Sequence, residues 1–169
     1  MRLDIGWFFL INTNQSRLER QLKPKQEILR AIFHIVGAAM IGNGIWMVSR
    51  AIEWFFHIPV DMPATGEPNG HLIRDVGFAY IVFGFALNWC AFKLECRRAV
   101  FLMVSFFMVA HALGHVVEIL IGLLPASHWW IDFPLVLFPG LILGVLAIPR
   151  VWASLVGDSG AGNQTSALC

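Results

Sequence analysis

Ala99 to Leu124, AVFLMVSFFMVAHALGHVVEILIGLL, is the stretch that decides the fold of this chain. It is apolar and long enough to cross a bilayer as one helix, yet it carries three ionisable residues, His111, His115 and Glu118. At about 100° per residue, all three side chains share one face of that helix. Because an ionisable group inside a bilayer costs on the order of 2.5–3.5 kcal/mol, this face should point into a protein interior that other helices surround.

The composition of the whole chain agrees with this stretch. Of the 169 residues, 57% are hydrophobic and only 14% are charged, and the mean hydropathy is +0.68. Soluble domains carry about 25% charged residues, so we expect an all-α, polytopic membrane protein. The basic residues are split among short loops and the formal net charge is only +1, so nucleic acid is not an expected partner. Cys90, Cys96 and Cys169 show no C-x-x-C spacing, which argues against paired redox cysteines.

Four hydrophobic runs predict a four-transmembrane-helix bundle over residues 28–156. The predicted spans are about 28–57, 71–92, 99–124 and 133–152. Pro139 predicts a kink in the last of them. Before the bundle, residues 1–27 read as a short cytoplasmic interfacial arm whose aromatic residues lie in the headgroup zone (Trp7, Phe8 and Phe9). After it, residues 157–169 read as a disordered cytoplasmic tail.

Small residues predict where helices approach one another closely. Ala38 and Gly42 have the small-x-x-x-small spacing in the first span, and Gly140 and Gly144 repeat it in the fourth. Such faces serve packing within the bundle, a homo-oligomer or a larger membrane complex. Asn43 offers an interhelical hydrogen bond.

The distribution of Lys and Arg predicts the orientation. Of the 12 basic residues, only Arg50 and Arg74 fall in the loops on one side of the predicted bundle, which leaves ten on the other. The positive-inside rule then places both termini in the cytoplasm. By helical rise, His111 lies ~18 Å, His115 ~24 Å and Glu118 ~28 Å from the inner end of the third span, which is the outer half of the bundle.

Further polar residues gather at the same outer level and form a candidate ligand-binding cluster. They are Asn43, Glu53, His57, His71, Arg74 and Asp75. Several histidines have a partner four residues away on the same helical face, in the pairs Glu53/His57, His71/Asp75, His111/His115 and His128/Asp132. Because an unpaired arginine would be expensive there, we expect Arg74 to pair with at least one of Glu53, Asp75 and Glu118.

Two function classes follow from these residues. The favoured one is a binding or accessory membrane protein, because the inner half of the bundle offers no continuous polar pathway for a channel or pump. The alternative is a metal- or haem-binding redox or transport protein that uses His111, His115 and Glu118, since two imidazoles and one carboxylate suit a divalent transition metal. A structural role for the three residues, a proton relay and substrate binding also stay open. Haem would need a second axial histidine from another helix, for which His57 is the marginal candidate.

Motifs of known enzymes give no further guidance. The chain contains no G-x-S-x-G, no Walker glycine loop and no multi-histidine desaturase pattern, so no catalytic residue is assigned.

The sequence His71-Leu-Ile-Arg-Asp-Val-Gly77, followed by Tyr80, Gly84 and a histidine-containing third span, resembles small bacterial four-helix membrane proteins of the DoxX-like kind. The resemblance covers roughly residues 31–152. It implies a four-helix fold and a multi-pass location in the bacterial inner membrane. It implies no reaction and no site residue.

Overall fold

The computed structural model of the chain describes residues 5–94 and 97–157, and every regular element in these ranges is helical. In chain order the elements are α1 (Ile5–Ser49), α2 (Ala51–His57), the 3-10 helix η1 (Met62–Thr65), α3 (Gly70–Phe92), α4 (Arg98–Leu120), α5 (His128–Ile131), the π-helix η2 (Phe133–Leu137), α6 (Phe138–Ala147) and α7 (Pro149–Val156). The all-α prediction is confirmed for this part of the chain.

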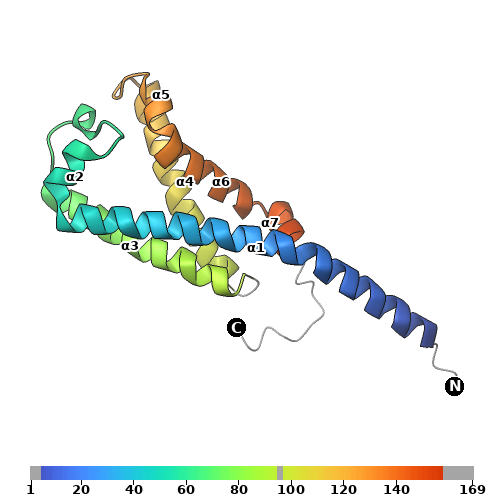
Figure 1. Cartoon of the computed structure of the whole chain (residues 1–169). Helices are drawn as coiled ribbons and strands as arrows, with labels where there is room; N and C mark the ends of the chain where they lie inside the picture. The colour runs from blue at the N-terminus through green and yellow to red at the C-terminus, as the bar shows by residue number, and fades with distance from the viewer. Residues whose placement is uncertain (1–4, 95–96, 158–169) are drawn as a thin grey trace.

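Two pairs of helices build the molecule (Figure 1). α1 packs along α3, and α4 packs along α6. The two pairs diverge toward the end where α2 and α5 lie. At the opposite end α7 packs against α1, where Gln26 Nε2 donates a hydrogen bond of 2.9 Å to the Val156 carbonyl oxygen. The space between the pairs is therefore closed at the α7 end and wider at the α5 end.

Buried apolar side chains form two clusters, one between the helix pairs and one among α1, α2 and α3. Near α7, the ring of Phe101 stacks on Phe33 and on Trp152, with centroids 4.9 and 4.8 Å apart. Beneath α2, a second buried cluster contains Met47 and Trp54. Tyr80 of α3 packs against both clusters and marks the level at which they meet.

Glycines allow α1 and α3 to touch backbone to backbone. A methyl group built on Gly44 would lie 2.5 Å from the Gly77 carbonyl oxygen, and one built on Gly84 would lie 2.7 Å from the Gly37 carbonyl oxygen. Gly42, which the small-residue spacing had selected, has no atom within 4 Å of such a methyl. The close approach is therefore made by Gly37 and Gly44, and the prediction of an Ala38/Gly42 contact was wrong.

The second predicted small-residue face lies inside the chain. A methyl on Gly140 would lie 2.7 Å from Ala112 Cβ and 3.0 Å from the Met108 carbonyl oxygen, and Gly144 faces Val109 at 3.0 Å. These glycines let α6 pack on α4, so this face is already occupied by another helix of the same chain.

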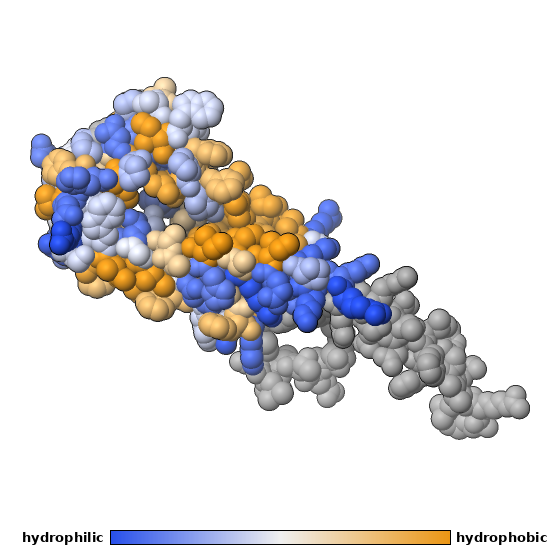
Figure 2. Space-filling view, in the orientation of Figure 1, coloured by the Kyte–Doolittle hydropathy of each residue, from blue (hydrophilic) through white to orange (hydrophobic). Residues whose placement is uncertain are grey.

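Three helical segments, Arg20–Ser49, Gly70–Phe92 and Arg98–Leu120, are long and apolar enough to cross a membrane. The segments Phe133–Ala147 and Pro149–Val156 pass the same test together, although the chain bends by 78° between them. Within residues 5–94 and 97–157 the count of candidate spans is thus three, or four if the bent pair is one span. Figure 2 shows exposed apolar side chains gathered along the middle of the molecule, with hydrophilic ones denser beside α2 and beside α7.

The first helix differs from its predicted bounds at both ends. It starts at Ile5 and continues through Pro24, so no break separates the predicted arm from the span. It ends at Ser49 instead of running to His57, because Arg50 leaves the helical region with φ −139° and ψ 55°. The third helix likewise ends earlier than predicted, at Leu120, and the chain turns through Gly122 at φ 78°.

The fourth segment bends at Pro149 and not at Pro139. Ile148 has φ −60° and ψ 125°, an extended conformation, because the ring of a following proline disfavours the helical region. Pro139 lies in the first turn of α6, directly after the π-helix η2.

Some predictions lie outside the described residues. These are the tail at 158–169, Cys96 and Cys169, and the interfacial placement of Trp7, Phe8 and Phe9, whose side chains are not described. Cys90 is described and is a buried free thiol.

Candidate functional site

The two histidines of α4 lie together on the face that α4 turns toward α3. Their rings are centred 4.9 Å apart and inclined by 72°, and both side chains are half-buried. The His111 ring lies parallel to Phe107 at 6.2 Å and edge-on to Tyr80 at 6.0 Å. The predicted shared face of His111 and His115 is therefore confirmed, and it points into the molecule.

Asp132 is the partner of His115, and the sequence did not assign it. Its side chain is 0% exposed, and its Oδ2 accepts hydrogen bonds from His115 Nδ1 at 2.8 Å and from His128 Nδ1 at 3.1 Å. The pair His128/Asp132 is spaced four residues apart, and the one-turn helix α5 brings both side chains to one face as expected. Asp132 thus joins a histidine of α4 to a histidine of α5.

Local backbone geometry fixes Asp132 in this position. Its N–H donates to the His128 carbonyl oxygen, and its own carbonyl oxygen accepts from Val136 at 2.8 Å and from Leu137 at 3.1 Å. The second of these bonds spans five residues, which is the π-helical pattern of η2. The residue therefore lies at the junction between two short helices, and its backbone is hydrogen-bonded to both.

His128 continues the chain of polar groups toward the surface. The side chain is 1% exposed, and its Nε2 has no hydrogen-bond partner. The nearest acidic atom is Oδ2 of Asp61, 3.8 Å away in the loop between α2 and η1. Asp61 is 53% exposed and has a left-handed backbone with φ 49° and ψ 48°, which is uncommon outside glycine although aspartate tolerates it.

We call Asp61, His111, His115, His128 and Asp132 the Asp132 cluster. A fully buried carboxylate requires compensation, which the two imidazole N–H groups provide through charge-assisted hydrogen bonds. Donation from Nδ1 also fixes the tautomer of both rings, so Nε2 of each neutral imidazole carries the free lone pair. The cluster consequently presents two oriented imidazole nitrogens, one from α4 and one from α5.

Glu118 does not join the cluster through its side chain. In the part of the chain that the structure describes, it forms neither a hydrogen bond nor an ion pair with His111 or His115, and its carbonyl oxygen accepts from Leu123 and Leu124 at the end of α4. Across residues 5–94 and 97–157, no three His, Cys, Asp or Glu side chains are placed to hold a metal ion together. The predicted three-ligand set is thus not assembled in this conformation.

The predicted ion pair of Arg74 was wrong. Arg74 donates to the Gly70 carbonyl oxygen at 3.0 Å, and it pairs with none of the three expected carboxylates. Two of these find partners within one helical turn: Glu53 pairs with Arg50 at 2.8 Å, and Asp75 lies 3.4 Å from His71. The hydrogen bond that Arg50 donates to the Glu53 carboxylate raises the pKa of its guanidinium.

Two other members of the predicted cluster make contacts within the α1–α2 region. Asn43 Oδ1 accepts from Trp54 Nε1 at 2.8 Å, which ties α2 to α1. His57 Nδ1 lies 2.9 Å from the Glu53 carbonyl oxygen at the end of α2. A ligand-binding role for Asn43, Glu53, His57, His71, Arg74 and Asp75 remains a prediction.

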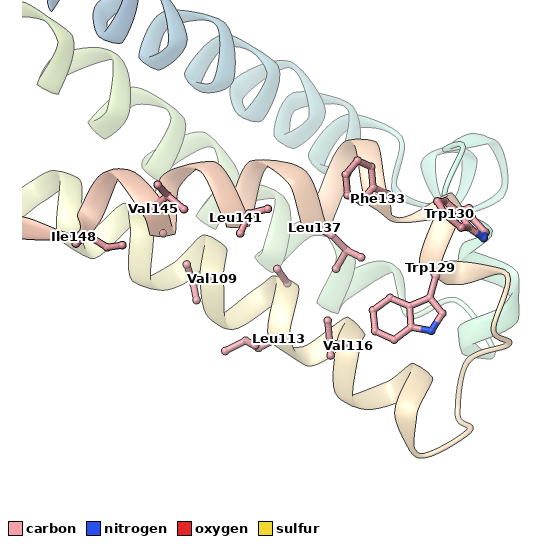
Figure 3. A pocket seen from close by; sticks show the side chains of 13 residues that line it. Val109, Leu113, Val116, Trp129, Trp130, Phe133, Leu137, Leu141, Val145 and Ile148 are labelled. Atoms are coloured by element: carbon pink, nitrogen blue, oxygen red, sulfur yellow. The ribbon is translucent and has the colours of Figure 1, made fainter. Parts of the chain in front are cut away.

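The opposite side of α4 borders a separate apolar groove of about 690 Å³ between α4 and α6 (Figure 3). Leu113 and Val116 contribute from α4, Leu141 and Val145 from α6, and Trp129 and Trp130 lie at the α5 end. No titratable side chain lines it. The groove therefore lies on the other face of the helix that carries the histidines.

Comparison of the chain with protein-family models, with curated proteins and with solved structures finds no match.

Proposed function

We propose that this chain is a small membrane protein that binds a divalent transition-metal ion between His111 and His115, with Asp132 as the group that orients His115. The observation that carries the proposal is the 2.8 Å hydrogen bond from His115 Nδ1 to a carboxylate with no exposed surface. In metal sites, a ligating histidine almost always donates its second ring nitrogen to such an acceptor, which fixes the ring and raises its basicity.

The spacing of the two rings supports a shared ion. With metal–nitrogen bonds of about 2.0–2.1 Å, an ion lies roughly 3 Å from each ring centroid. Rings centred 4.9 Å apart can then hold one ion at a roughly tetrahedral angle. Both rings come from one regular helix, so their separation needs little adjustment. The two remaining coordination positions would be open to water or to a molecule that the protein receives or delivers, as in a binding protein, since closed structural sites use four protein ligands.

We also propose the membrane arrangement within which this site works. Four spans, with both termini in the cytoplasm of a bacterium and the chain in its inner membrane, agree with the distribution of basic residues. The basic first half of α1, the turn between α3 and α4, and α7 all belong to one end of the molecule (Figure 1). The Asp132 cluster then lies in the outer half, where a polar site within an apolar bundle is a functional site by default. The DoxX-like resemblance favours the same location.

The test is a titration of the purified full chain with Co²⁺, whose visible absorption reports nitrogen and oxygen ligands. We expect His111→Gln and His115→Gln each to abolish the band, because each removes one of the two protein ligands. Asp132→Asn should weaken metal binding by about 10–100-fold, the usual effect of removing the carboxylate that orients a ligating histidine. His34→Gln is the matched control, since His34 is an exposed histidine whose ring bonds to Asn88, outside the proposed site. An unchanged band in both α4 variants, or no band in the unmodified chain, would refute the proposal.

A further inference from the structure

We infer a second cation position at the other end of the Asp132 cluster, between Asp61 and His128, where a divalent transition-metal ion is captured from the aqueous side. This inference rests on the proposed function for its class of ligand, but its residues are different. It accounts for a feature that the His111/His115 site leaves unexplained, which is the buried Nε2 of His128.

The first supporting observation is this orphaned atom. A buried polar nitrogen without a partner is costly, and native structures contain few of them. His128 is 1% exposed and donates a hydrogen bond through Nδ1 to Asp132. Its Nε2 lone pair is therefore directed away from Asp132, and no hydrogen-bond donor faces it. The ring is oriented by a buried carboxylate in the same manner as His115. A metal ion at Nε2 would satisfy the lone pair.

The second observation is the distance to the facing carboxylate. Nε2 of His128 and Oδ2 of Asp61 are 3.8 Å apart, which is too long for an N–H···O hydrogen bond. An ion about 2.0–2.2 Å from each atom would fit between them, because the two bonds then span the separation at an angle wider than tetrahedral. The gap is thus too wide for a hydrogen bond and the right size for one ion.

The third observation is access. Asp61 is 53% exposed and lies on the loop between α2 and η1, whereas His128 is enclosed. One ligand therefore meets solvent and the other faces inward. An ion taken up here would lie on one side of Asp132, and the His111/His115 position would lie on the other. The order Asp61, His128, Asp132, His115, His111 describes capture at the surface followed by deeper binding.

The test uses Zn²⁺ alone as the probe and equilibrium dialysis of the purified full chain in detergent. We expect two ions per chain, and one ion per chain after Asp61→Asn. Asparagine also tolerates the left-handed backbone, so this variant removes charge while keeping the loop conformation. Glu67→Gln is the matched control, because Glu67 is another exposed carboxylate in the stretch between α2 and α3 and belongs to neither proposed position. The control should still bind two ions.

The tryptophan fluorescence of the chain gives a second measurement, because two of its seven tryptophans, Trp129 and Trp130, directly follow His128. Zn²⁺ should change it in the unmodified chain and in Glu67→Gln, and the half-maximal change in Asp61→Asn should need at least a tenfold higher Zn²⁺ concentration.

The outcomes separate this inference from the proposed function. Two ions bound by Asp61→Asn, or one ion bound by the unmodified chain and lost only in His111→Gln, would overturn the second position and leave the first. Ion binding that survives in His111→Gln but not in Asp61→Asn would support the second position and refute the first. No bound zinc in the unmodified chain would refute both, and His128 and Asp61 would then form a simple ion pair.

Discussion

Replacing Gly44 by alanine should separate α1 from α3. The added methyl would lie 2.5 Å from the Gly77 carbonyl oxygen, 2.8 Å from Ile81 Cγ1 and 3.0 Å from the Ile81 nitrogen. Two of these three atoms belong to the backbone of a regular helix, so a change of side-chain rotamer cannot relieve the overlap. The helices must move apart, and the contacts on either side of Gly44 loosen with them.

The magnitude follows from two opposing effects. Forcing an extra carbon into a close-packed contact typically costs about 1–3 kcal/mol. Alanine in place of glycine inside a helix gains about 0.5–1 kcal/mol. For Gly44→Ala the overlap dominates, and we expect a net loss of stability of about 1–2 kcal/mol. For Gly42→Ala only the gain remains, because nothing lies within 4 Å of the new methyl.

The two variants should therefore shift thermal unfolding in detergent in opposite directions. Size-exclusion chromatography after heating measures the midpoint, and circular dichroism checks that helix content is retained at low temperature. Gly42→Ala is a strong control, since it lies two residues away on the same helix and makes the same chemical change. If Gly44→Ala were as stable as Gly42→Ala, the backbone contact between α1 and α3 would not exist as described.

Three further substitutions test other contacts through the same midpoint. Asp132→Ala should destabilise the protein by about 3–5 kcal/mol, because it removes the acceptor of both His115 and His128 from a fully buried position; a loss below ~1 kcal/mol would contradict the geometry. Ser105→Ala should cost about 0.5–1.5 kcal/mol by removing the 3.1 Å hydrogen bond to the Leu143 carbonyl oxygen that joins α4 to α6. Arg74→Ala should change stability by less than about 0.5 kcal/mol, because the side chain is exposed and bonds only to its own helix; a large loss would revive an ion-pair role.

The sequence was sufficient to predict the all-α class and the approximate positions of the long helices. Apolar runs of more than 20 residues leave few alternatives to helices, since every backbone group must be satisfied within the segment. The bend at Pro149 could also have been predicted from the sequence, because the residue before a proline is biased away from the helical conformation. The break at Arg50 carries no such signal, because neither glycine nor proline lies at that position.

The glycine contact shows how a local spacing rule can select the wrong residues. Ala38 and Gly42 fit the four-residue pattern, but the contact uses Gly37 and Gly44, which are seven residues apart, as are Gly77 and Gly84 on α3. A spacing of seven returns to nearly the same face of a helix. The matching spacing on two predicted helices was the available signal, and it requires that the helices be compared with each other.

The candidate site was only partly predictable for a similar reason. His111 and His115 follow from helical periodicity alone, because both belong to one regular helix. Asp132 is 17 residues beyond His115, so their contact depends on how the turn after α4 leads into α5. Asp61 depends on a left-handed residue in an irregular loop. Periodicity says nothing about either of these conformations.

The placement of the Asp132 cluster explains why irregular elements carry most of it. The helix pairs α1–α3 and α4–α6 diverge at this end (Figure 1), and beyond the contact of His111 with Tyr80 the polar groups of the two pairs meet through shorter elements. Three short segments connect the pairs here. The one-turn helix α5 supplies His128, the junction between α5 and the π-helix η2 supplies Asp132, and the loop before η1 supplies Asp61. In the proposed two-position arrangement, α4 contributes a rigid pair of ligands and the loop contributes an adjustable one. An ion held between Asp61 and His128 would therefore join the two helix pairs at their open end, and metal binding should stabilise the protein against unfolding by mass action.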